Sequence, residues 1–183
     1  MSEGFPAGEE LAALSASSLT VWHYDSVLGA AAGELRLRDL QQREAVTVVD
    51  AVSVTWVHGA HAPRIGHLRH RSSSGDRSVL AGLLALVVPD PAPADDPRDV
   101  LGTLARRLEG TGIERDFLQD IRSRLEPGTS ALTVLATDAD IDEVRGVVER
   151  GRARGDVRLM HAMLRTGAAE RLAAAVHELQ DRG

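Results

Sequence analysis

The stretch Gly112–Asp138, GIERDFLQDIRSRLEPGTSALTVLATD, determines the fold predicted for this chain. In its first half, apolar residues recur at helical spacing and form one stripe, which comprises Ile113, Phe117, Leu118, Ile121 and Leu125. Pro127 and Gly128 end this predicted helix, because proline lacks an amide donor and glycine tolerates positive φ. Residues 131–136 are apolar except for Thr133, as expected of a strand that is covered on both faces.

Elements on both sides of this unit follow from apolar alternation, helical spacing and capping residues. Thr111 and Glu114 are spaced as a capping box, so the helix of the central unit is expected to begin at Thr111. The other predicted strands span residues 18–24, 46–57, 64–70 and 157–164. The segment 46–57 is either one bent strand or two pieces separated at Asp50. The other predicted helices span residues 25–43, 79–88, 99–109, 140–150 and 166–180. Predicted caps are Asp25 or Ser26 for the first of these, Asp140 for the fourth and Thr166 for the last.

The predicted helix at 25–43 has two features that bear on its packing. Its inner face is expected to comprise Val27, Leu28, Ala31, Ala32, Leu35 and Leu40. Gly29 and Gly33 lie four residues apart and indicate close packing of the helix on a sheet.

An internal echo indicates the topology. The segment SLTV at 18–21 recurs as ALTV at 131–134, and each copy is followed by an aspartate, a predicted helix and a predicted strand. Two β-α-β halves that share one sheet describe a ferredoxin-like α+β sandwich. We therefore predict a flexible tail at 1–17 and a single domain at 18–183. A helical insertion at 71–125, with a proline-rich linker at 89–97, is expected to separate the halves.

The composition excludes several classes of function. The 183 residues carry a net charge of −6, which argues against general affinity for nucleic acid. The chain has no cysteine, which excludes thiolate catalysis and cysteine-ligated metal sites. Glu3, Glu9 and Glu10 lie where a signal peptide carries positive charge, so a cytoplasmic location is expected.

Several motifs resemble one family. The most specific is PGTSAL at 127–132, and the others are Gly112-Ile113, Asp116-Phe117, the opening LTVW at 19–22 and the strand from Asp50 to Trp56. Through these motifs the chain resembles the bacterial domain-of-unknown-function 1269 family over about residues 19–179. The resemblance implies a membrane-associated or stress-associated protein without an established activity. It implies no catalytic residue and no cofactor.

Residues 79–88 take the place of the long, glycine-rich apolar hairpin that the resemblance implies. This segment is too short to cross a bilayer, because a spanning helix needs roughly 20 residues. Asp90, Asp95 and Asp96 follow it, and each would cost roughly 2.5–3.5 kcal/mol at a bilayer centre. We therefore expect a soluble form in which this helix packs on its own sheet or on a second subunit. The candidate interface residues are Val79, Leu80, Leu83, Leu84, Leu86 and Val87.

Four histidines form the most suggestive candidate for a metal site. They are His58, His61, His67 and His70, and they cross a predicted hairpin. Imidazoles suit zinc, copper or nickel. The alternation of a strand, however, sends His67 and His70 to opposite faces, and nearby arginines disfavour a cation. Solvated histidines on an edge strand are the alternative interpretation.

Two further groups of polar residues have both a structural and a functional interpretation. His23 is either a satisfied core histidine or a ligand or general base in a pocket on the sheet face. Such a pocket would lie opposite His161 and near Trp22, Tyr24 and Trp56. The acidic residues Asp138, Asp140, Asp142 and Glu143 are explained by helix capping and by the helix dipole.

The pattern as a whole predicts a non-enzymatic interaction or scaffold domain that self-associates. The partner is expected to be a second copy or another protein, with no nucleic acid and no catalytic residues. Two alternatives stay open: membrane-peripheral attachment through 79–88, and a sensor for a small molecule or a metal. A stress-related role follows only from the family resemblance.

Overall fold

The computed structural model describes residues 17–68, 78–88, 99–150 and 157–181. The tail predicted at 1–17 lies outside these residues except for Ser17, and the linker predicted at 89–97 lies outside them entirely. His70 of the candidate metal site also falls outside the described residues.

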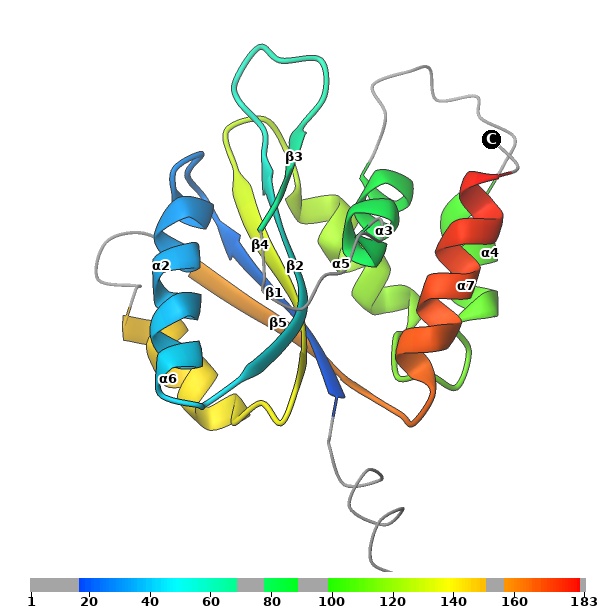
Figure 1. Cartoon of the computed structure of the whole chain (residues 1–183). Helices are drawn as coiled ribbons and strands as arrows, with labels where there is room; N and C mark the ends of the chain where they lie inside the picture. The colour runs from blue at the N-terminus through cyan, green and yellow to red at the C-terminus, as the bar shows by residue number, and fades with distance from the viewer. Residues whose placement is uncertain (1–16, 69–77, 89–98, 151–156, 182–183) are drawn as a thin grey trace, which may run out of the picture.

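The described strands form one antiparallel sheet in the order β3-β2-β4-β1-β5 (Figure 1). Their bounds are β1 Ser17–Tyr24, β2 Thr47–Thr55, β3 Arg64–His67, β4 Ser130–Thr137 and β5 Val157–Leu164. The two similar segments that formed the internal echo are direct neighbours, with Leu19 opposite Leu135 and Val21 opposite Thr133. Both central strands are almost wholly buried, as the apolar run in β4 predicts.

Helices cover both faces of the sheet (Figure 1). On one face lie α2 (Gly29–Gln42) and α6 (Ile141–Arg150), which enclose a core around Trp22 and Leu132. The other face is covered by α3 (Val79–Val87), α4 (Val100–Arg107), α5 (Arg115–Arg124) and α7 (Ala168–Gln180), which share a second core. The α+β class is therefore confirmed, with helices between β3 and β4 where the sequence predicts an insertion.

The face by which α2 packs differs from the prediction. Leu28 and Leu35 were expected inside, but their side chains are 74% and 64% exposed. The sheet instead receives Ala30, Gly33, Leu37 and Leu40. Tyr24 accounts for this orientation, because its side chain lies against Gly29 and Gly33 and leaves no room for a Cβ atom at either position.

A buried hydrogen-bond pair holds α2 in that orientation. The Ala30 amide donates to the Ser130 Oγ atom at 2.9 Å, and that hydroxyl donates to the Ser26 carbonyl at 2.6 Å. The predicted cap at Asp25 or Ser26 is wrong, because the N-cap residue is Leu28 and has no side-chain hydrogen bond. The close packing indicated by the two glycines is confirmed.

The predicted starts of α5 and α7 are also wrong. The N-cap residue of α5 is Glu114, and Thr111 closes the end of α4 by donating to the Leu108 carbonyl at 2.6 Å. The Thr111 hydroxyl also accepts from the Ile113 amide at 3.2 Å, so it is used within the loop. Helix α7 follows Gly167, whose φ of 78° ends the turn after β5, so Thr166 is not its cap.

Asp50 of β2 connects the sheet to α3. This segment is one strand with a β-bulge between Val48 and Asp50, rather than two separate pieces. The Asp50 carboxylate accepts from the Ser78 hydroxyl at 2.8 Å and from the Leu80 amide at 3.0 Å. The bulge thereby directs a charged acceptor to the first turn of α3, where negative charge suits the helix dipole.

Candidate interaction surface

The apolar helix α3 belongs to the core of the chain. Four of the six interface candidates, Leu80, Leu83, Leu84 and Val87, are fully buried. Gly82 permits close approach to Val176 of α7. These four side chains are therefore unavailable as a contact surface in this conformation, whereas Val79 and Leu86 are only partly buried.

The candidate metal ligands do not meet in the part of the chain that the structure describes. His58, His61 and His67 are exposed. Across the described ranges, no group of three or more His, Cys, Asp or Glu side chains could hold a metal ion. His67 lies on the edge strand β3 opposite Val52, and the ring of His58 lies against Gly128.

His23 is a buried histidine with a structural hydrogen bond. Its ring Nε2 atom lies 2.8 Å from the Arg124 carbonyl at the end of α5, and its Nδ1 atom lies 3.7 Å from Asp25. Burial lowers the pKa of His23, although the carbonyl and Asp25 oppose this effect. The alternative that placed His161 opposite His23 is wrong. His161 lies opposite Thr20 and so on the other face of the sheet, whereas His23 lies opposite Arg158.

Two of the acidic residues around the start of α6, Asp140 and Glu143, have structural contacts. The Asp140 Oδ1 atom accepts from the amides of Asp142 at 3.1 Å and Glu143 at 3.0 Å, as the capping interpretation predicts. Glu143 forms an ion pair with Arg43 of the α2 C-cap at 3.3 Å. These contacts join α6 to α2 on one face of the sheet.

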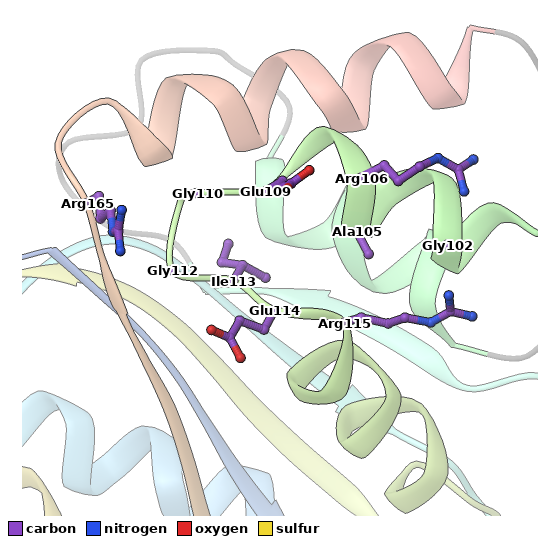
Figure 2. A pocket seen from close by; sticks show the side chains of 10 residues that line it. All are labelled: Gly102, Ala105, Arg106, Glu109, Gly110, Gly112, Ile113, Glu114, Arg115 and Arg165. Atoms are coloured by element: carbon purple, nitrogen blue, oxygen red, sulfur yellow. The ribbon is translucent and has the colours of Figure 1, made fainter.

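One pocket of about 580 Å³ lies between α4, the loop 109–114, the start of α5 and Arg165 (Figure 2). Arg106 and Arg115 extend at the Gly102 end, whereas Arg165 lies at the other end beside Gly112 (Figure 2). Arg115 pairs with Asp99 at 3.8 Å. Because two glutamates also line the pocket and the arginines do not converge, the pocket does not select a ligand of one charge.

The outer face of α2 carries an apolar surface that the sequence prediction placed inside. We call Leu28, Ala31, Ala32 and Leu35 the α2 outer stripe. All four residues are exposed, and their spacing of three, four and seven residues places them on one side of the helix. At about 100° per residue, this side is opposite the buried face formed by Ala30, Gly33, Leu37 and Leu40.

Two signals in the sequence could have identified this orientation. Gly29 and Gly33 mark the side of the helix that approaches another element closely, and Ala30, Leu37 and Leu40 lie on that same side. The larger apolar stripe then faces outward. Exposed leucines scattered singly are ordinary, but two on one helix face, separated by two alanines, form a continuous surface.

Comparison with known proteins shows the family to which the chain belongs. A family model described as "Protein of unknown function (DUF1269)" matches residues 79–177, which is more than half of the 183 residues. The chain belongs to this family. Neither the search of curated proteins nor the search of solved structures finds a match.

The DUF1269 match covers the chain from α3 into α7 and includes β4 and β5. It therefore includes the PGTSAL motif at 127–132 but not the motifs at 19–22 and 50–56, which had also indicated the DUF1269 family. The α2 outer stripe lies before the matched region. In the described part of the chain, no helix is both long enough and apolar enough to cross a membrane.

Proposed function

We propose that this DUF1269 protein is a non-enzymatic interaction domain that self-associates through the α2 outer stripe. The observation that carries the proposal is the exposure of Leu28 and Leu35 on one face of a helix whose opposite face is buried in the core. A cytoplasmic location and a stress-related role stay predictions.

The architecture that presents the stripe is proposed to be ferredoxin-like. Strands β2-β4-β1-β5 lie in the order expected for two split β-α-β halves, and each neighbouring pair is antiparallel. The two helices of the halves, α2 and α6, lie on one face of the sheet. The edge strand β3 and the helices α3, α4, α5 and α7 are additions to this arrangement.

Burial of the stripe would supply the driving force for association. Full burial of one leucine side chain contributes about 1.5–3 kcal/mol. A symmetric contact would bury Leu28 and Leu35 from each of two copies. The alanines between them allow two helix axes to approach to about 8–10 Å, which is the usual distance for packed helices.

Sedimentation velocity over a range of concentrations tests this proposal. We expect the wild-type protein to self-associate and the Leu28→Gln/Leu35→Gln variant to remain monomeric, with its fold retained because both side chains are exposed. Val57→Gln is the matched control, since Val57 is a 48% exposed apolar residue outside the stripe. A wild-type protein that stays monomeric, or a double variant that associates normally, would refute the proposal.

A further inference from the structure

We infer that the partner of the α2 outer stripe is a second copy of this chain, bound with its α2 antiparallel to the first about a twofold axis. The inference rests on the proposed function, which already names self-association, and adds the geometry of the contact. A twofold contact requires a self-complementary surface, in which each residue faces the residue that faces it in return.

The α2 outer stripe has this property. It reads Leu-x-x-Ala-Ala-x-x-Leu from Leu28 to Leu35 and is the same in both directions. In an antiparallel pair centred between Ala31 and Ala32, Leu28 of one copy faces Leu35 of the other. The small alanines then meet at the axis, where the helices are closest, and the leucines pack on either side of them.

The charged residues just beyond the two ends of the stripe are symmetric about the same centre, which lies between Ala31 and Ala32. Asp25 lies in the turn before α2, three residues before Leu28, and Arg38 lies three residues after Leu35. Both residues are exposed. The antiparallel pairing brings Asp25 of each copy to Arg38 of the other, so two pairs of opposite charge form across the contact.

A parallel arrangement lacks this complementarity. It places Asp25 beside Asp25 and Arg38 beside Arg38, and like charges at close range disfavour association. A bilayer is also a poor partner, because Asp25, Glu34, Arg38 and Asp39 surround a stripe of only four apolar residues. The pattern therefore favours a second copy over a lipid surface.

The test is a charge exchange measured by sedimentation equilibrium. Arg38→Asp alone and Asp25→Arg alone are each expected to weaken self-association by about tenfold or more, because two repulsive pairs replace two attractive ones. An equimolar mixture of the two variants is expected to form heterodimers at close to wild-type affinity. In that mixture, both charge pairs are complementary again.

The controls separate this inference from the proposed function. Thermal unfolding of each variant verifies that the fold is retained. If association depends on Leu28 and Leu35 but is unchanged by the charge exchange, the antiparallel pairing is refuted. The proposed function as a self-associating interaction domain then still stands. If association is lost in Met163→Gln but not in the leucine variant, the contact lies at the edge strand β5. That result, or a monomeric wild-type protein, would refute both the proposed function and the antiparallel pairing.

Discussion

At the residue scale, His23 shows how a polar side chain is accommodated in the core. This residue of a central strand is 6% exposed, yet its Nε2 atom reaches the Arg124 carbonyl at the end of α5. The hydrogen bond uses a carbonyl that the helix itself leaves without a partner. His23 thus joins β1 to the C-terminal end of α5 through a neutral ring whose Nε2–H donates.

Stability is expected to fall in acid because of His23. Burial holds the pKa of His23 below its ordinary value of about 6.5, so the unfolded chain takes up the proton more readily than the folded chain. The contribution of the neutral ring is therefore complete above about pH 6.5 and is lost as the pH falls through the lower folded-state pKa. Urea unfolding at pH 7.5 and pH 5.0 measures this loss.

The matched variants for this experiment are His23→Gln and His177→Gln. The first removes the titrating group and is expected to reduce the loss of stability between the two pH values. The second changes an exposed histidine that pairs with Asp181 at 3.3 Å, and it is expected to leave the His23 contribution in place. An unchanged pH dependence in His23→Gln would contradict this account.

At the scale of the element, α3 depends on a residue of the sheet. Its sequence is apolar throughout, so it has no acidic residue in its first turn. Ser78 supplies one cap by accepting from the Ala81 amide at 3.1 Å, and Asp50 supplies the negative charge from the bulge in β2. The start of α3 is therefore determined by two segments that are far apart in the sequence.

Replacing Asp50 is expected to destabilise the fold. Asp50→Ala leaves the Leu80 amide and the Ser78 hydroxyl without this acceptor, and we expect a loss of about 1–3 kcal/mol in the free energy of unfolding. Asp50→Asn keeps one acceptor oxygen and should lose less. Urea titration followed by circular dichroism measures both changes, and equal stability of Asp50→Ala and the wild type would contradict the proposed cap.

At the scale of the whole molecule, the two faces of the sheet differ in how they are covered. The face under α3, α4, α5 and α7 is closed by helices that enclose the apolar side chains of α3. The face under α2 and α6 is also covered, but α2 turns its outer stripe to solvent. Any assembly built on this stripe therefore leaves the α3 core undisturbed.

Such an assembly is expected to make thermal stability depend on concentration. Binding of the folded state to a second folded copy stabilises it by mass action. Over a hundredfold range of protein concentration, we expect the unfolding temperature of the wild type to rise by about 3–6 °C. Leu28→Gln/Leu35→Gln should show no such rise. Differential scanning fluorimetry makes this comparison, and a constant midpoint for the wild type would contradict self-association.

Predictions based on a single dominant pattern agree with the structure. The stripe around Leu118 and Ile121 is buried, the run in β4 is a central strand, and the segment at 79–88 forms a buried helix. Predictions for segments in which two patterns compete do not agree with the structure. In α2 the stripe of Leu28, Ala31, Ala32 and Leu35 competed with the face that contains Gly33, Leu37 and Leu40, and the packing of Tyr24 against Gly29 and Gly33 selected the second.

Predictions for the polar residues also agree with the structure where they depend on local contacts and disagree where they depend on distant ones. The capping role of Asp140 depends only on nearby amides, and the structure confirms it. The pairing of His23 with His161 depended on the relative register of two strands, and the register places the two side chains on opposite faces. A shift of one residue in register reverses the face of every side chain in a strand, so alternation within one strand cannot predict such a pair.

The sequence by itself determined the order of helices and strands, because spacing, turn residues and capping act over only a few residues. The repeated pattern of the two similar strands also indicated that they share one sheet, whereas their direct pairing is seen only in the structure. Only the tertiary structure decided which side of α2 faces the sheet and which acceptor begins α3. The first choice involves the nearby Tyr24 together with Ser130, which is 100 residues from Ala30. The second involves Asp50, which is 30 residues from Leu80. Those contacts form only when the chain has folded.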